Sequence, residues 1–102
     1  MNGKVDVEFS QEAEPNKTTS QRQKPPGYTP KQGQYLAFIY YYTKIHGVPP
    51  AQWEIQRYFR VTPPTVHQMI LKLERLGFLH RIPNQLRSVQ VLLSKEELPD
   101  LD

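Results

Sequence analysis

Two threonine-proline pairs and two glycines divide the middle of this 102-residue chain into helices of defined length. Thr29 and Thr62 each stand directly before a proline, and a capping hydroxyl followed by proline is the pattern that opens an α-helix. Gly47 and Gly77 supply the residue type that commonly ends a helix. The chain is therefore predicted to hold a long helix between Thr29 and Gly47 and a second one over 63–76.

A shorter helix and a hairpin are expected around the second of these helices. The segment 51–59 carries apolar residues at helical spacing and runs into a turn at Arg60. Beyond Gly77, the runs 78–82 and 87–93 are joined by a Pro-Asn turn, and the later run alternates valine with polar residues. The order helix, helix, helix, hairpin predicts a mainly α fold with a small β-hairpin, namely a three-helix winged helix-turn-helix domain.

Composition sets the expected limits of this domain. Residues 1–27 have hardly a hydrophobic side chain after Phe9, so they cannot bury enough surface to offset chain entropy, and we expect a disordered arm. We place the domain at 28–93 and an acidic C-terminal tail at 94–102. The chain has no cysteine, no signal-peptide pattern at its start and no apolar run of membrane-spanning length. The expected location is therefore the cytoplasm, or the nucleoid if the organism is bacterial.

Positive charge is concentrated in the segment 28–93. Eight lysine and arginine residues there face two glutamates, whereas 1–27 is balanced and 94–102 is acidic. Such a segment is either a solvated basic surface or one that attracts a polyanion. Because a helix-turn-helix places the second of two helices in a major groove, we expect double-stranded DNA as the partner.

The helix over 63–76 is the expected recognition helix, since its apolar stripe from Val66 faces the core and leaves a polar face outside. Base contacts are predicted for residues near its start: Pro64, Thr65, His67 and Gln68. Phosphate contacts are predicted for hydroxyl and basic residues around it: Arg57, Arg60, Thr62, Lys72 and Arg75. The wing is predicted to add polar residues at and around the hairpin tip: His80, Arg81, Asn84, Gln85 and Arg87.

The first helix is rich in aromatic residues, which suggests more than one use for them. One hypothesis is that its side forms a homodimer or partner interface, built from Phe38, Tyr41, Tyr42 and Ile45. The alternative is that Trp53, Tyr58 and the hairpin cover these rings within one monomer. The pattern alone leaves both open.

Two stretches carry family-like motifs. Residues 47–55 read Gly-x-Pro-Pro-x-x-x-Glu-Ile, and residues 62–79 begin with Thr-Pro and end with Leu-x-x-x-Gly-Phe-Leu. Over about Tyr28 to Leu93 the chain resembles the N-terminal DNA-binding domain of the LexA repressor family. The resemblance implies a transcriptional regulator that contacts DNA through Pro64, Thr65, His67 and Gln68. It does not extend to that family's self-cleaving domain, with its serine nucleophile and lysine base, so we expect no self-cleavage.

An enzyme is not expected from these residues. The three histidines, His46, His67 and His80, lack metal-ligand spacing, and no glycine-rich phosphate loop or Ser/His/Asp set is visible. We therefore expect no metal, no cofactor and no small-molecule ligand. The alternative to DNA binding is a winged-helix module used only for protein contact, because fold does not determine function.

Overall fold

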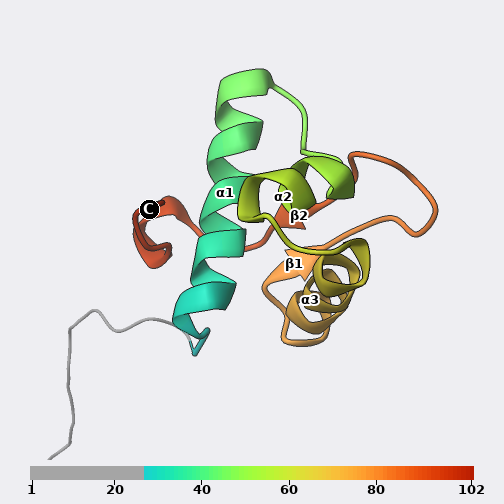
Figure 1. The fold of residues 1–102 in the computed structure, drawn as a ribbon. Helices are drawn as coiled ribbons and strands as arrows, with labels where there is room; N and C mark the ends of the chain where they lie inside the picture. The colour runs from blue at the N-terminus through green and yellow to red at the C-terminus, as the bar shows by residue number, and fades with distance from the viewer. Residues whose placement is uncertain (1–26) are drawn as a thin grey trace, which may run out of the picture.

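The computed structural model describes residues 27–102, so the arm predicted for 1–27 lies, except for its last residue, outside the described residues. The elements follow in the order α1 (Pro30–His46), α2 (Gln52–Phe59), α3 (Pro63–Arg75), β1 (Leu79–His80), β2 (Gln90–Val91) and a 3₁₀ turn, η1 (Lys95–Glu97). Strands β1 and β2 form an antiparallel pair beside the three helices (Figure 1). This is the predicted winged helix-turn-helix order. Within the described part of the chain, no helix has the length and hydropathy of a membrane span.

The helix ends follow local chemistry closely. At α1 the Thr29 hydroxyl accepts a hydrogen bond from the Gln32 amide at 3.1 Å, and the Gln32 side-chain oxygen accepts one from the Thr29 amide at 2.9 Å. This reciprocal pair satisfies two amides that a helix start leaves free. Gly47 ends α1 in the left-handed conformation, with φ of 77°. Thr62 does occupy the cap position of α3, but its hydroxyl pairs with the Thr65 hydroxyl at 2.8 Å instead of capping a backbone amide.

The core lies where α1, α2, α3 and the sheet meet. The apolar stripe predicted from Val66 onward is fully buried at Val66, Ile70 and Leu73, whereas Leu76, at the C-cap of α3, is 47% exposed. Tyr35 of α1 is also buried and stacks on an aromatic ring of α2. The other large, fully buried side chains of the core are Leu36, Ile39, Ile55 and Leu79.

The hairpin is paired over a shorter length than its sequence predicted. Only two residues of each strand pair, and the long loop 81–89, called the wing below, connects them. At its base the Ser88 hydroxyl accepts a hydrogen bond from the Ile82 amide at 3.0 Å and lies 3.1 Å from the Ile82 carbonyl. Asn84 and Arg87 have positive φ values, which turns the backbone away from strand geometry. The wing is therefore a folded loop and not an extended ladder.

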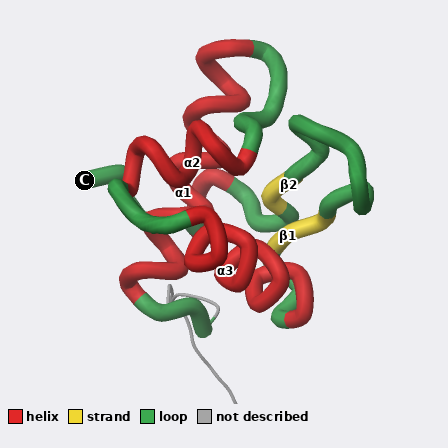
Figure 2. Tube along the Cα trace, turned by 45° about the vertical axis from the view of Figure 1, so that its right-hand side comes forward, coloured by secondary structure: helices red, strands yellow, loops and turns green. Residues whose placement is uncertain are grey.

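The segment 94–102, expected as an acidic C-terminal tail, folds onto the helices. The Gln34 side-chain nitrogen donates to the Asp100 carbonyl at 2.9 Å, and its side-chain oxygen accepts from the Asp102 amide at 2.9 Å. The Tyr58 hydroxyl donates to the Asp102 carbonyl at 3.0 Å. Two partly buried leucines of the segment pack on the core, Leu98 and Leu101. The segment lies across α1 on the side away from α3 (Figures 1 and 2).

Gly33 permits this packing at the start of α1. A Cβ atom at position 33 would lie 2.8 Å from Cε1 of Tyr28 and 3.0 Å from Cγ of Pro99. The Tyr28 hydroxyl donates to the Glu97 carbonyl, which ties the first described residues to η1. The two ends of the described chain are thus joined over α1.

Candidate nucleic-acid interface

The exposed face of α3 brings five of the predicted DNA-contacting residues together. They line a shallow hollow of about 590 Å³ along the helix, called the α3 strip below, and are Pro64, Thr65, Gln68, Lys72 and Arg75. Residues three or four apart lie on one face of a helix, which explains why the residues near the start of α3 align with Lys72 and Arg75 near its end. A ligand lying along the strip would meet neutral hydrogen-bonding groups near the start of α3 and two cations near its end.

His67 is separated from the α3 strip. Its side chain is exposed on the flank of α3 that faces the wing, where it lines a second hollow of about 390 Å³ together with Pro50, Gln52 and residues of the wing. The structure therefore places three of the four predicted base-contacting residues on one strip and the fourth between α3 and the wing.

Arg57 and Arg60 are exposed on either side of the end of α2. Arg60 caps α2 in the left-handed conformation, with φ of 57°, and its amide donates to the Gln56 carbonyl. Within residues 27–102, no carboxylate pairs with these two arginines, nor with Lys72 or Arg75. Four cations near α3 therefore keep their charge uncompensated by any described side chain, and they give this side of the domain a positive potential.

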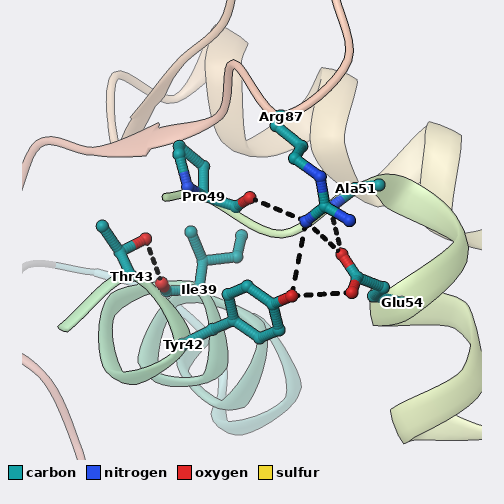
Figure 3. A network of polar contacts seen from close by, with 7 residues as sticks. All are labelled: Ile39, Tyr42, Thr43, Pro49, Ala51, Glu54 and Arg87. Atoms are coloured by element: carbon teal, nitrogen blue, oxygen red, sulfur yellow. Dashed lines mark hydrogen bonds and ion pairs between the residues drawn. The ribbon is translucent and has the colours of Figure 1, made fainter. Parts of the chain in front are cut away.

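Arg87 is hydrogen-bonded to three groups of the domain itself. Its Nη1 atom donates to Glu54 Oε1 at 2.6 Å, to the Pro49 carbonyl at 3.3 Å and to the Tyr42 hydroxyl at 3.3 Å. The Tyr42 hydroxyl in turn donates to Glu54 Oε2 at 2.6 Å (Figure 3). This group of contacts, called the Arg87 latch below, ties the wing to both α1 and α2.

The latch keeps Glu54 ionised. Partial burial alone would raise the pKa of Glu54, but hydrogen bonds from Tyr42, from the Ala51 amide and from Arg87, together with the charge of Arg87, outweigh burial and lower it. Hydrogen bonds to Tyr42 and Glu54 raise the pKa of Arg87 in turn. At neutral pH both partners of the ion pair are therefore charged.

Arg81, the other arginine of the wing, is also paired. Its Nε atom lies 3.1 Å from Glu74 Oε1 of α3, and its side chain is largely buried. Glu54 and Glu74 are the only acidic residues between Tyr28 and Leu93, and each neutralises one wing arginine. Three other predicted wing residues are exposed, namely His80, Asn84 and Gln85.

The aromatic face expected on the first helix is largely covered. Phe38 is buried, and its ring stacks on Tyr58 at a centroid distance of 4.4 Å. Tyr42 is half-buried, and its hydroxyl belongs to the Arg87 latch. Tyr58 of α2 therefore covers Phe38 within one chain, so Phe38 is not available to a partner. Trp53, the other ring of α2 considered as a cover, is 54% exposed. Of the other two members of the expected interface, Tyr41 is half-buried and Ile45 is 76% exposed.

Comparison with known proteins agrees with this geometry. Residues 25–88 match the family model described as the LexA DNA binding domain. The chain belongs to this family. It is 37% identical over 71 residues to the LexA repressor of Bartonella quintana (strain Toulouse). The aligned segment covers 69% of this chain and 30% of that repressor. It is 31% identical over 70 residues to the LexA repressor of Thermosipho melanesiensis (strain DSM 12029 / CIP 104789 / BI429). That aligned segment covers 69% of this chain and 35% of the repressor.

The chain spans about a third of the length of these curated relatives. The region that matches the LexA DNA-binding domain model contains all three helices and most of the wing. The resemblance drawn from the sequence motifs is therefore confirmed for this domain, together with its winged helix-turn-helix fold.

Glu54 is a residue of the Arg87 latch that the sequence pattern did not single out. Glu54 is the third residue of α2, and its carboxylate accepts a hydrogen bond from the Ala51 amide at 2.8 Å. The same carboxylate accepts a hydrogen bond from Arg87. One signal was available, since Glu54 is one of only two acidic residues in a strongly basic segment. A carboxylate in that setting is expected to meet a cation.

Proposed function

We propose that this LexA-type domain binds specific sequences of double-stranded DNA as a transcriptional regulator, and that it acts as a repressor. The observation that carries the proposal is the α3 strip, which offers neutral hydrogen-bonding groups and cations along one exposed helix face, with no described carboxylate paired to those cations. A B-form major groove is wide enough to admit one such helix.

In the proposed complex the start of α3 contacts base edges. Gln68 can pair with adenine through its amide, Thr65 can touch a thymine methyl group and His67 can donate to a guanine acceptor. Pro64 adds an apolar contact near the same end of the helix. These residues account for sequence preference because base edges, unlike phosphates, differ from one base pair to another.

The phosphate contacts come from the cations and the hydroxyl around α3. Lys72 and Arg75 belong to the strip itself, Thr62 occupies the cap position of α3, and Arg57 and Arg60 lie at the end of α2. Each phosphate that they neutralise releases counterions from the DNA, so affinity should fall steeply as salt rises. The two relatives described above are LexA repressors, which supports repression as the function of this domain.

Two alanine variants test the division between base and phosphate contacts. A binding sequence is first selected from randomised duplexes, and affinity is then measured by fluorescence anisotropy at several salt concentrations. Gln68→Ala should relax preference at one base pair, by about 1 to 3 kcal/mol of discrimination, with an unchanged salt slope. Lys72→Ala should weaken all duplexes alike and reduce the slope of log affinity against log salt by about 0.9.

Lys31→Ala is the matched control for Lys72→Ala. Lys31 lies at the start of α1, where it lines a hollow with Gln34 and Asp102, and it carries the same charge as Lys72. Its removal should leave affinity and salt slope close to the wild-type values. Equal effects of the two lysine variants would contradict the placement of α3 at the DNA. Failure of the wild type to bind any duplex with salt-sensitive affinity would instead favour the protein-contact alternative.

A further inference from the structure

The tip of the wing carries no charge. Residues 82–86, called the wing tip below, read Ile-Pro-Asn-Gln-Leu, and the arginine on either side of them is held by a glutamate of the domain. The Arg81 pair measures 3.1 Å and the Arg87 pair 2.6 Å. A wing that worked by neutralising phosphates would leave its cations unpaired, so this wing is built for a different kind of contact.

The wing tip exposes apolar side chains instead. Leu86 is 80% exposed and Ile82 is 48% exposed, which is unusual for large aliphatic residues in a short loop. The Gln85 amide donates to the Ile82 carbonyl at 3.2 Å across a turn in which Asn84 has φ of 64°. Proline followed by a left-handed asparagine fixes a tight turn, so the two apolar residues project from a defined backbone.

The base of the wing is fixed to the helices on both sides. The Arg87 latch holds one end to α1 and α2, the Arg81 ion pair holds the other end to α3, and the Ser88 hydroxyl bridges to the Ile82 backbone. The wing tip also borders the same hollow as His67 of α3. The apolar tip is therefore held at a set position beside His67 of the proposed DNA-binding face. Figure 3 shows the Arg87 contacts that fix one end of the wing.

We propose that the wing tip is an apolar wedge that enters the minor groove beside the major-groove site of α3, and that Leu86 determines sequence preference there. This inference rests on the proposed function. Aliphatic side chains and proline can insert between base steps in a minor groove, and groove width and base-pair type decide how easily they enter. No acidic residue of the wing tip repels phosphates, and the cations of α2 and α3 bring the backbone close.

The first experiment compares Leu86→Ala with Leu92→Ala. Leu92 is also an exposed leucine, at 54%, but it lies outside the wing, so it is a control of identical chemistry. On the selected duplex, Leu86→Ala should lower affinity about 10-fold, because an aliphatic side chain loses its buried surface, while the salt slope stays at the wild-type value. Leu92→Ala should change neither. Since Leu86 packs on nothing in the core, both variants should keep the wild-type melting temperature.

The second experiment changes the minor groove alone. Replacing guanine by inosine in the base pairs flanking the α3 site removes the minor-groove amino group and leaves the major-groove acceptors in place. Wild type should change affinity when flanking pairs are replaced, and Leu86→Ala should lose that response.

Wild-type affinity and wild-type inosine response in Leu86→Ala would overturn the wedge while leaving the proposed DNA binding intact. An absence of binding by the wild type to every duplex would overturn both. Sedimentation without DNA supplies the remaining outcome. If the wild type were a dimer and Leu86→Ala a monomer, the tip would be a contact between copies of the chain and the proposal would be wrong.

Discussion

Gly33→Ala gives the sharpest test of how the C-terminal segment is attached to α1. Whether the substitution raises or lowers the free energy of unfolding depends on the packing of Tyr28 and Pro99 against position 33. Alanine in place of glycine inside an exposed helix normally stabilises it by about 1 kcal/mol. At position 33 the new Cβ would instead stand 2.8 Å from Cε1 and 3.0 Å from Cδ1 of the Tyr28 ring, and 3.0 Å from Cγ of Pro99. Distances this short force a neighbour to move.

The cost follows from what the Tyr28 ring would have to give up. It packs edge-on against Phe78, with the ring centroids 6.0 Å apart, and its hydroxyl holds the Glu97 carbonyl. A shift of the ring to make room for the new Cβ would therefore disturb the Phe78 contact or the hydrogen bond to η1. Overpacking of this kind costs about 1 to 3 kcal/mol, which exceeds the gain in helix propensity. We expect a net loss of about 1 kcal/mol of unfolding free energy, or a fall in Tm of about 4 to 8 °C.

Thermal unfolding followed by circular dichroism measures this change, and Tyr28→Ala provides the second arm of a double-mutant cycle. Without the Tyr28 ring, two of the three short distances from the new Cβ are removed. The third, to Cγ of Pro99, requires only a small shift of the proline ring. Gly33→Ala should then be neutral or stabilising in the Tyr28→Ala background. Hydrogen exchange should show faster exchange in residues 94–102 for Gly33→Ala alone. A Gly33→Ala single variant more stable than wild type would refute the docking of the C-terminal segment against α1.

Two further outcomes are expected. The pKa of Glu54 is lower in the folded state than in the unfolded state, so the Arg87 latch adds stability above the unfolded pKa and loses it as pH falls through the folded pKa. Urea unfolding between about pH 7 and pH 3 should show a decline that is smaller in Glu54→Gln. Within α3, Ile70→Ala should cost about 2 to 5 kcal/mol because the side chain is fully buried. Leu76→Ala, at a half-exposed position, should stay within about 1 kcal/mol of wild type in the same assay.

Features encoded by neighbouring residues were predictable from the sequence. The capping pair of Thr29 and Gln32 is three residues apart, and the core stripe of α3 repeats at helical spacing, so both are visible without knowledge of the fold. The hairpin was predictable in kind but not in length. Its strands separate after two residues because Ser88 and the left-handed Arg87 redirect the backbone, and neither effect follows from alternation of valines.

Features that depend on contacts between distant residues were not predictable in the same way. Arg87 and Glu54 are 33 residues apart, and Gln34 and Asp100 are 66 apart, so no local pattern joins them. Charge counting correctly placed the excess of positive charge but could not tell a paired arginine from an unpaired one. The contacts by which Arg87 holds the wing therefore do not follow from its type and position in the sequence.

Arg60 has a strained backbone conformation. A left-handed backbone costs a residue with a Cβ about 1 kcal/mol more than it costs glycine, and Arg60 adopts it at the turn between α2 and α3 with φ of 57°. Positions that break a local rule in this way tend to be kept for function. Under selection for heat resistance alone, glycine should be among the earliest replacements at position 60. Because Arg60 is a proposed phosphate contact, arginine should persist there under selection for DNA binding in spite of its strain.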